Sequence, residues 1–194
     1  MNIENFKPLE GLTFEEVFDK QIALEFMYEP LAKEVFDNFD IDCFTDQEEF
    51  KRYCWRVVEE LTEALEALDN KEETHVREEL MDGFNFIIEL IGMYGWSAKD
   101  LDFTVNIPLS DTEDRLRINI CETIKDIGLT ANILKNRAWR QSQYLVDLYV
   151  FEKRLRKAFN TYLNLLRSQM SDEEIIKTWS LKYQVNVFRL KTKY

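Results

Sequence analysis

The chain has 194 residues, of which 45% are hydrophobic and 13% aromatic, and it carries a net charge of −12. This length and composition can supply a substantial core, which excludes an intrinsically disordered protein. Five glycines and three prolines are too few for the turns of a many-stranded β protein, so we expect an all-α fold. The acidic charge argues against non-specific binding to nucleic acid or to an anionic membrane.

Capping boxes and apolar periodicity predict a helical bundle. Ser or Thr stands three residues before Glu at Thr13, Thr45 and Ser171. In chain order we expect helices over residues 14–29, 31–39, 46–69, 74–94, 112–134, 142–166 and 171–184, a helical turn at 97–101, a loop around Pro108 and a short C-terminal tail. Asn70 and Gly95 are the expected stops of the third and fourth helices. Without a repeat or a linker, residues 1–194 are read as one domain.

The expected compartment is a reducing cytoplasm. The N-terminus has no basic stretch followed by an apolar one, and no segment is apolar enough to predict a membrane span. Three cysteines and a single histidine suggest neither a zinc site nor a disulfide framework.

Charge is distributed unevenly along the chain. Residues 135–194 carry a net charge of +8, which leaves −20 for residues 1–134. Such an asymmetry suits a polyphosphate that is bridged by metal ions, with carboxylates for the cations and basic groups for the phosphates. Solvated helix faces would explain it equally well.

The helix expected over residues 46–69 carries acidic residues in two different settings. Its apolar face is formed by Phe50, Cys54, Val57, Leu61, Ala64, Leu65 and Leu68. Glu59 and Glu66 fall on the opposite, solvent side, whereas Glu60 and Glu63 lie along the margin of the apolar face. Their spacing of three residues brings two like charges together, and these repel unless a cation or a proton intervenes.

The helix expected over residues 74–94 repeats this pattern. Glu79 projects into the widened side of its apolar face, with Asp82 one turn further on, whereas Glu78 and Glu89 are expected to point away. A carboxylate among apolar residues is costly unless it is neutralised or bound to metal. Two helices joined by a tight turn pack antiparallel, so the two acidic pairs should meet. Oxygen ligands without His or Cys favour Mg²⁺ or Mn²⁺.

The acidic string has a known counterpart. Glu59-Glu60-Leu61-Thr62-Glu63, a gap of fifteen residues and Glu79-Leu80-Met81-Asp82 resemble the E-E-x-x-E … E-x-x-D signature of the all-α nucleoside triphosphate pyrophosphatases. These include the dimeric dUTPases, the phage-type dCTP/dUTP pyrophosphatases and the MazG-like enzymes. The resemblance covers about residues 50–95. It implies that the Mg²⁺ ligands are Glu60, Glu63, Glu79 and Asp82, the four acids that the helical wheel selects.

The C-terminal segment, residues 170–194, is similar to the end of the dimeric dUTPases and phage enzymes, where a helix leads into Lys-x-x-x-Asn-x-x-Arg and then Tyr. By that similarity the triphosphate would be contacted by Lys182, Asn186, Arg189 and Tyr194. Such side chains can donate to phosphate oxygens. The chain departs from the family at Leu190 and Lys193, where Gln and Gly are common, and at Asn85, where His is common. A basic solubilising tail is the alternative interpretation.

Two weaker resemblances concern the base. The string Lys135-Asn-Arg-Ala-Trp139-Arg140-Gln141 resembles a stretch of some phage relatives. Trp139 would either stack on a base, with Lys135 or Arg140 reaching phosphate, or pack into the core at a corner between helices. Gln21 resembles the Gln that contacts the pyrimidine in this family.

Taken together, the resemblance implies a homodimer that hydrolyses a deoxypyrimidine triphosphate, dUTP or else dCTP, to the monophosphate and pyrophosphate with Mg²⁺, Glu60 activating the water. Uracil and cytosine differ in their donors and acceptors, and a rotating amide of Gln21 or Asn85 can serve either. Two alternatives stay open: a MazG-like enzyme of broad specificity, and a non-catalytic acidic helical protein that binds a partner.

Overall fold

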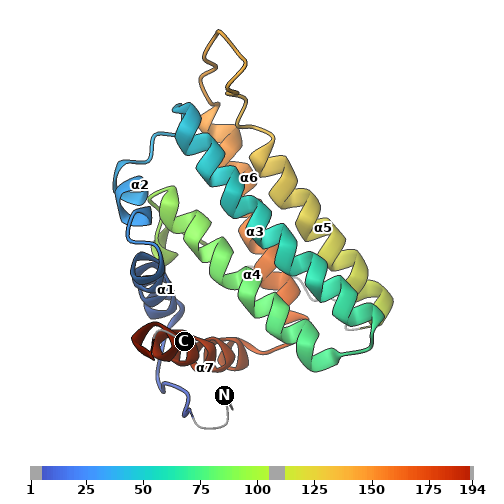
Figure 1. Ribbon diagram of the computed structural model, residues 1–194. Coiled ribbons are helices and arrows are strands. Elements are labelled where there is room, and N and C mark those ends of the chain that lie inside the picture. Colours follow the sequence, from blue (N-terminus) through green and yellow to red (C-terminus); the bar gives the residue numbers. More distant parts are fainter. Residues whose placement is uncertain (1–5, 105–111, 193–194) are drawn as a thin grey trace.

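The computed structural model describes residues 6–104 and 112–192, and this part of the chain contains helices and no strand (Figure 1). The helices are α1 (Phe14–Tyr28), α2 (Ala32–Asn38), α3 (Phe44–Asp69), α4 (Glu73–Met93), the 3₁₀ turn η2 (Ala98–Asp100), α5 (Glu113–Ala131), α6 (Leu148–Arg167) and α7 (Asp172–Thr192). The predicted all-α fold is confirmed. The loop expected around Pro108 and the terminal Tyr194 lie outside the described residues.

Four long helices form the body of the molecule. Helix α3 runs antiparallel to α4 and also packs on α5, which in turn packs on α6 (Figure 1). Helices α1 and α7 pack against each other and against α4 at one side of this bundle. The large side chains that fill the core are fully buried and include Phe50, Leu61, Leu80, Phe84, Phe159 and Trp179. Burial of these apolar surfaces is the main favourable contribution to folding.

Two of the three predicted capping boxes are present. The Thr13 hydroxyl accepts from the Glu16 backbone N–H at 3.3 Å and the Glu16 carboxylate accepts from that of Thr13 at 2.8 Å. Ser171 and Glu174 repeat these bonds at the start of α7. The box at Thr45 was wrong, because α3 already begins at Phe44, and Asp46 instead accepts from the Asp40 backbone N–H at 2.8 Å.

Left-handed residues end α3 and α4. Gly95, with φ of +82°, follows α4 as predicted, and the Trp96 N–H donates back to the Ile91 carbonyl at 3.1 Å. Helix α3 ends at Asp69 with Asn70 as its C-cap, as predicted, and the left-handed residue that follows is Lys71, with φ of 62°. This short connection sends α4 back along α3, which is what brings their acidic residues together.

Three predictions about exposure and extent are corrected. Helix α6 begins at Leu148 rather than near residue 142, because Asp147 caps it by accepting from the Val150 N–H at 3.1 Å. Helix α7 continues to Thr192, so residues 185–192 are helical and not a tail. Glu89 does not point to solvent: it is 2% exposed, because α1 covers its side of α4. None of the described helices is long and apolar enough to cross a membrane.

Two helical glycines should respond in opposite ways to replacement by alanine. A Cβ at Gly83 would collide with the phenol of Tyr162, which donates to the Leu80 carbonyl at 2.7 Å, whereas a Cβ at Gly128 meets nothing within 4 Å. We expect Gly83→Ala to lower the free energy of unfolding by about 1–3 kcal/mol through overpacking. Gly128→Ala should raise it by about 0.5–1 kcal/mol through helix propensity. Urea unfolding followed by circular dichroism measures both, and a loss of equal size in the two variants would contradict the close approach at Gly83.

Candidate active site

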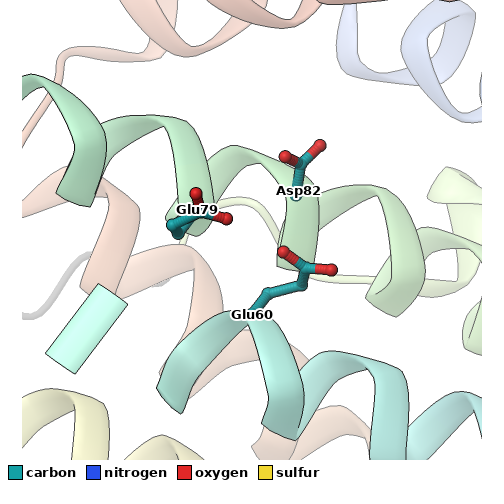
Figure 2. A group of neighbouring side chains, drawn as sticks. All are labelled: Glu60, Glu79 and Asp82. Carbon is teal, nitrogen blue, oxygen red and sulfur yellow. The ribbon is translucent and has the colours of Figure 1, made fainter. Parts of the chain in front are cut away.

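Three carboxylates converge where α3 faces α4. Glu60 comes from α3, and Glu79 and Asp82 come from successive turns of α4 (Figure 2). One carboxylate oxygen of each lies within 4.8 Å of those of the other two, the geometry of a group that can hold a metal ion. Glu79 is only 7% exposed. Hard oxygen donors without nitrogen or sulfur fit Mg²⁺ or Mn²⁺.

The electrostatics of this cluster also fit a cation. Burial, a hydrogen bond shared with Glu79 and the negative charges of Asp82, Glu79 and Glu63 together raise the pKa of Glu60 to about 8. Burial likewise raises the pKa of Asp82, while the ammonium of Lys182 opposes that rise. Carboxylates this close cannot all ionise without a compensating charge. The cluster therefore holds either protons or a cation.

The fourth predicted ligand lies outside the cluster. Glu63 is exposed one turn beyond Glu60, which it influences by charge. Glu59 and Glu66 are exposed, as the wheel predicted. Glu63 differs from them by its place beside Glu60, so its role as a ligand stays a prediction.

A groove that contains both basic and acidic side chains adjoins the cluster. It has a volume of about 790 Å³, lies between α4 and α7, and is lined by Asp82 together with Lys182, Asn186 and Arg189. Lys182 forms an ion pair with Asp82 and donates to the Glu78 carbonyl at 3.3 Å. Three of the four residues predicted to contact phosphate thus line one groove that starts at the carboxylates.

The sequence reasoning missed three residues here. Arg77 and Lys177 line the same groove, and the only histidine, His75, places Nδ1 3.1 Å from a carboxylate oxygen of Glu79. Lys177 lies within the helix predicted over residues 171–184, but no motif in the sequence singled it out. A helical wheel continued to Thr192 would have shown how α7 presents its basic residues.

Gln21 and Asn85 lie at the other end of the cluster. Asn85 follows Asp82 by one turn of α4, is 7% exposed, and has no hydrogen-bond partner for its Oδ1. Gln21 of α1 is 5% exposed and donates through Nε2 to Glu89 at 2.9 Å. Asp82, Asn85 and Glu89 share one face of α4, so polar groups continue from the carboxylates towards Gln21.

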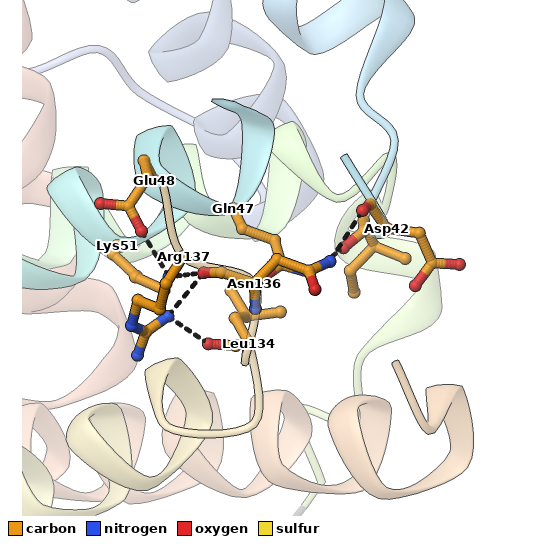
Figure 3. A network of polar contacts seen from close by, with 8 residues as sticks. Asp42, Gln47, Glu48, Lys51, Leu134, Asn136 and Arg137 are labelled. Atoms are coloured by element: carbon orange, nitrogen blue, oxygen red, sulfur yellow. Dashed lines mark hydrogen bonds and ion pairs between the residues drawn. The ribbon is translucent and has the colours of Figure 1, made fainter. Parts of the chain in front are cut away.

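The segment between α5 and α6 does not approach the carboxylates. The Asn136 side chain accepts from the Tyr144 N–H at 2.7 Å, and its backbone N–H donates to Gln47 at 2.9 Å. These bonds fix residues 135–147 as an arm at the start of α3, where Asn136 lies beside Gln47 (Figure 3). Gln47 and Glu60 are thirteen residues apart on α3, roughly 20 Å along the axis. The arm projects from that end of the bundle (Figure 1).

Trp139, at 78% exposure on this arm, therefore does not pack into the core. Lys135 donates to the Asn132 side chain at 2.8 Å, and the guanidinium of Arg140 lies over the Tyr144 ring. Within one chain these side chains are far from the groove between α4 and α7. The residue of the string with a clear local role is Asn136, whose bonds hold the arm in place.

An all-helical protein with clustered carboxylates on paired helices, beside a groove that contains Lys182 and Arg189, has the architecture of the all-α nucleoside triphosphate pyrophosphatases. A family model described as dUTPase matches residues 64–194, which include Glu79, Asp82 and all of α7. The chain belongs to this dUTPase family. No curated protein and no solved structure matches the chain.

The raised pKa of Glu60 predicts how stability depends on pH when divalent metal is absent. Its pKa moves from 4.5 to about 8, so over this interval the folded state binds more protons than the unfolded state, and stability falls as the pH rises. We expect the Tm in chelator to fall across this range and Glu60→Gln to weaken the fall. Scanning calorimetry of this variant and of the exposed control Glu59→Gln measures the effect. Equal slopes in both variants would refute the assignment to Glu60.

Proposed function

We propose that the protein hydrolyses a deoxypyrimidine triphosphate, with dUTP as the first substrate and dCTP as the second, to the monophosphate and pyrophosphate in a reaction that needs Mg²⁺. The observation that carries this proposal is the convergence of three carboxylates beside a groove into which α7 presents Lys182 and Arg189, in a member of the dUTPase family. Glu60, Glu79 and Asp82 would hold the metal, with Glu63 one turn away. Bound there, Mg²⁺ would neutralise phosphate charge and polarise the α-phosphoryl group.

Residues of α3 and α7 have separate roles in the proposed reaction. Glu60, which has the raised pKa, accepts the proton of a water that attacks the α-phosphorus. Lys182 and Arg189 balance the charge that develops on the β- and γ-phosphates as pyrophosphate leaves. Asn186 donates to phosphate from the same groove. No covalent intermediate is needed, and the site offers no activated nucleophile.

No specific feature of the structure favours either of the two alternatives drawn from the sequence. A non-catalytic acidic protein would not need Glu79 buried between two helices, where an uncompensated charge costs stability. A MazG-like enzyme of broad specificity would not need the basic face of α7, which lies in the segment that the dUTPase family model matches.

The inner and outer acidic residues of α3 and α4 should differ in their effect on turnover. Glu60→Gln and Asp82→Asn remove groups of the cluster, and we expect each to lower kcat by about 100-fold or more. Glu59→Gln and Glu66→Gln alter exposed residues of the same helix and should stay within a few-fold of the original rate. Pyrophosphate release with Mg²⁺ or Mn²⁺, and with chelator, is the measurement. Equal losses in the inner and outer variants would remove the basis of the site.

Substrate choice is tested by a panel of ribo- and deoxynucleoside triphosphates that includes dUTP and dCTP. We expect the highest kcat/KM for dUTP, with dCTP next and with purine and ribonucleotides far lower. A preference for purines would leave only a metal-dependent pyrophosphatase. Absence of turnover with every triphosphate would instead favour the non-catalytic acidic protein.

We propose, in addition, that two copies of the chain associate. The arm and the first turn of α6 expose several large apolar side chains, namely Trp139, Tyr144, Leu145, Leu148, Tyr149 and Val150. Exposed apolar groups gathered in one region are typical of an association surface. Analytical ultracentrifugation at micromolar concentration should give the mass of a dimer, and Leu145→Glu should shift the protein towards the monomer. A monomer before any substitution would contradict the proposal.

A further inference from the structure

The amide of Gln21 is held from two sides in a buried setting. Its Nε2 donates to Glu89 at 2.9 Å, and its Oε1 accepts from the indole N–H of Trp179 at 3.1 Å. Trp179 is fully buried and stacks on Tyr183, with ring centroids 5.0 Å apart. Three helices thus meet at one side chain: α1 supplies Gln21, α4 supplies Glu89 and α7 supplies Trp179.

These contacts determine which way the amide faces. An indole N–H can only donate, so the Gln21 atom next to it must be the oxygen. Rotation of the amide by half a turn would place the NH₂ group against the indole N–H and leave two buried donors facing each other. An unpaired buried donor is costly, so the rotated state is disfavoured.

The surroundings of Gln21 contain further unsatisfied groups. Oδ1 of Asn85 and Oε2 of Glu89 are buried and have no hydrogen-bond partner. Buried polar atoms of this kind normally find a partner, and a bound ligand with donor groups would supply one. They lie on the face of α4 that leads away from Asp82, so a nucleotide with its phosphates at the carboxylates would direct its base this way.

We propose that Trp179 makes the site selective between uracil and cytosine by fixing the orientation of the Gln21 amide. This rests on the proposed function and on the resemblance by which Gln21 is expected to contact the pyrimidine. Uracil presents an N–H donor at N3 next to a carbonyl, whereas cytosine presents an acceptor at N3 next to an amino group. A freely rotating amide can pair with the edge of either base. An amide whose orientation and position are fixed pairs well with only one of the two bases. Trp179 is accordingly a positioning residue.

The test compares kcat/KM for dUTP and dCTP before and after removal of the indole N–H. The original protein should prefer dUTP by roughly ten- to hundredfold, the effect of one mispaired buried group. Burial and the charge of Glu25 raise the pKa of Glu89 well above its usual range, so its carboxyl can carry a proton and either accept from or donate to the amide. The indole N–H, which can only donate, is then the contact that distinguishes the two orientations. Trp179→Phe removes it, and the ratio of the two values should fall to within a few-fold of one. A role of Trp179 in packing alone would instead lower both values equally and keep their ratio.

Because Trp179 is buried, the Phe variant could lose stability, and a second replacement covers that case. In Trp179→benzothienylalanine a sulfur replaces the N–H while the ring shape is kept, and the same fall in ratio is expected. Trp96→Phe is the matched control, because Trp96 packs on Tyr94 and Arg156 away from Gln21, and it should keep the ratio.

The outcomes separate the two proposals. An unchanged ratio in the benzothienylalanine protein overturns the role of Trp179, as does equal turnover of dUTP and dCTP by the original protein, while both results leave the proposed hydrolysis intact. Lack of turnover of either pyrimidine nucleotide by the original protein overturns the proposed function and this inference with it.

Discussion

The mutual repulsion of the carboxylates between α3 and α4 is the constraint on which the other features of the molecule depend. Three of them are held within 4.8 Å of one another, beside a core that offers little water. The close approach that holds them there is permitted by Gly83, whose backbone lies against Tyr162 and Glu60. This arrangement is stable only when a positive charge or a proton balances the charge of the carboxylates.

Helix α7 supplies one positive charge to the carboxylates and also contacts Gln21. Lys182 pairs with Asp82, and one turn earlier Trp179 holds the amide of Gln21. A single helix therefore contacts both ends of the polar groups that line α4. Any shift of α7 along its axis would therefore change the groove beside Asp82 and the orientation of the Gln21 amide together.

The sequence predicted best those features that depend only on neighbouring residues of one helix. Helix periodicity and capping boxes located most of the helices, and the helical wheel separated Glu60 from Glu59 because burial follows the 3.6-residue repeat. The helical wheel gave the wrong exposure for Glu89, because the packing of α1 buries that side of α4. No pattern within the sequence of α4 predicts this contact. Likewise Asn136, in a string read as a binding motif, bonds to groups that are 89 and 94 residues away in the chain. Contacts of this kind depend on the tertiary fold, which periodicity does not encode.

The bond between Trp179 and Gln21 has a consequence for the order in which the molecule assembles. These residues are 158 positions apart, so their contact closes a loop that contains most of the chain. During synthesis on the ribosome, α3 and α4 can pair early, whereas α1 waits for α7 to emerge before its polar face is covered. Nascent chains therefore pass through a stage in which Glu60, Glu79 and Asp82 have converged without Lys182, so their charges must be balanced by protons or by another cation in that interval.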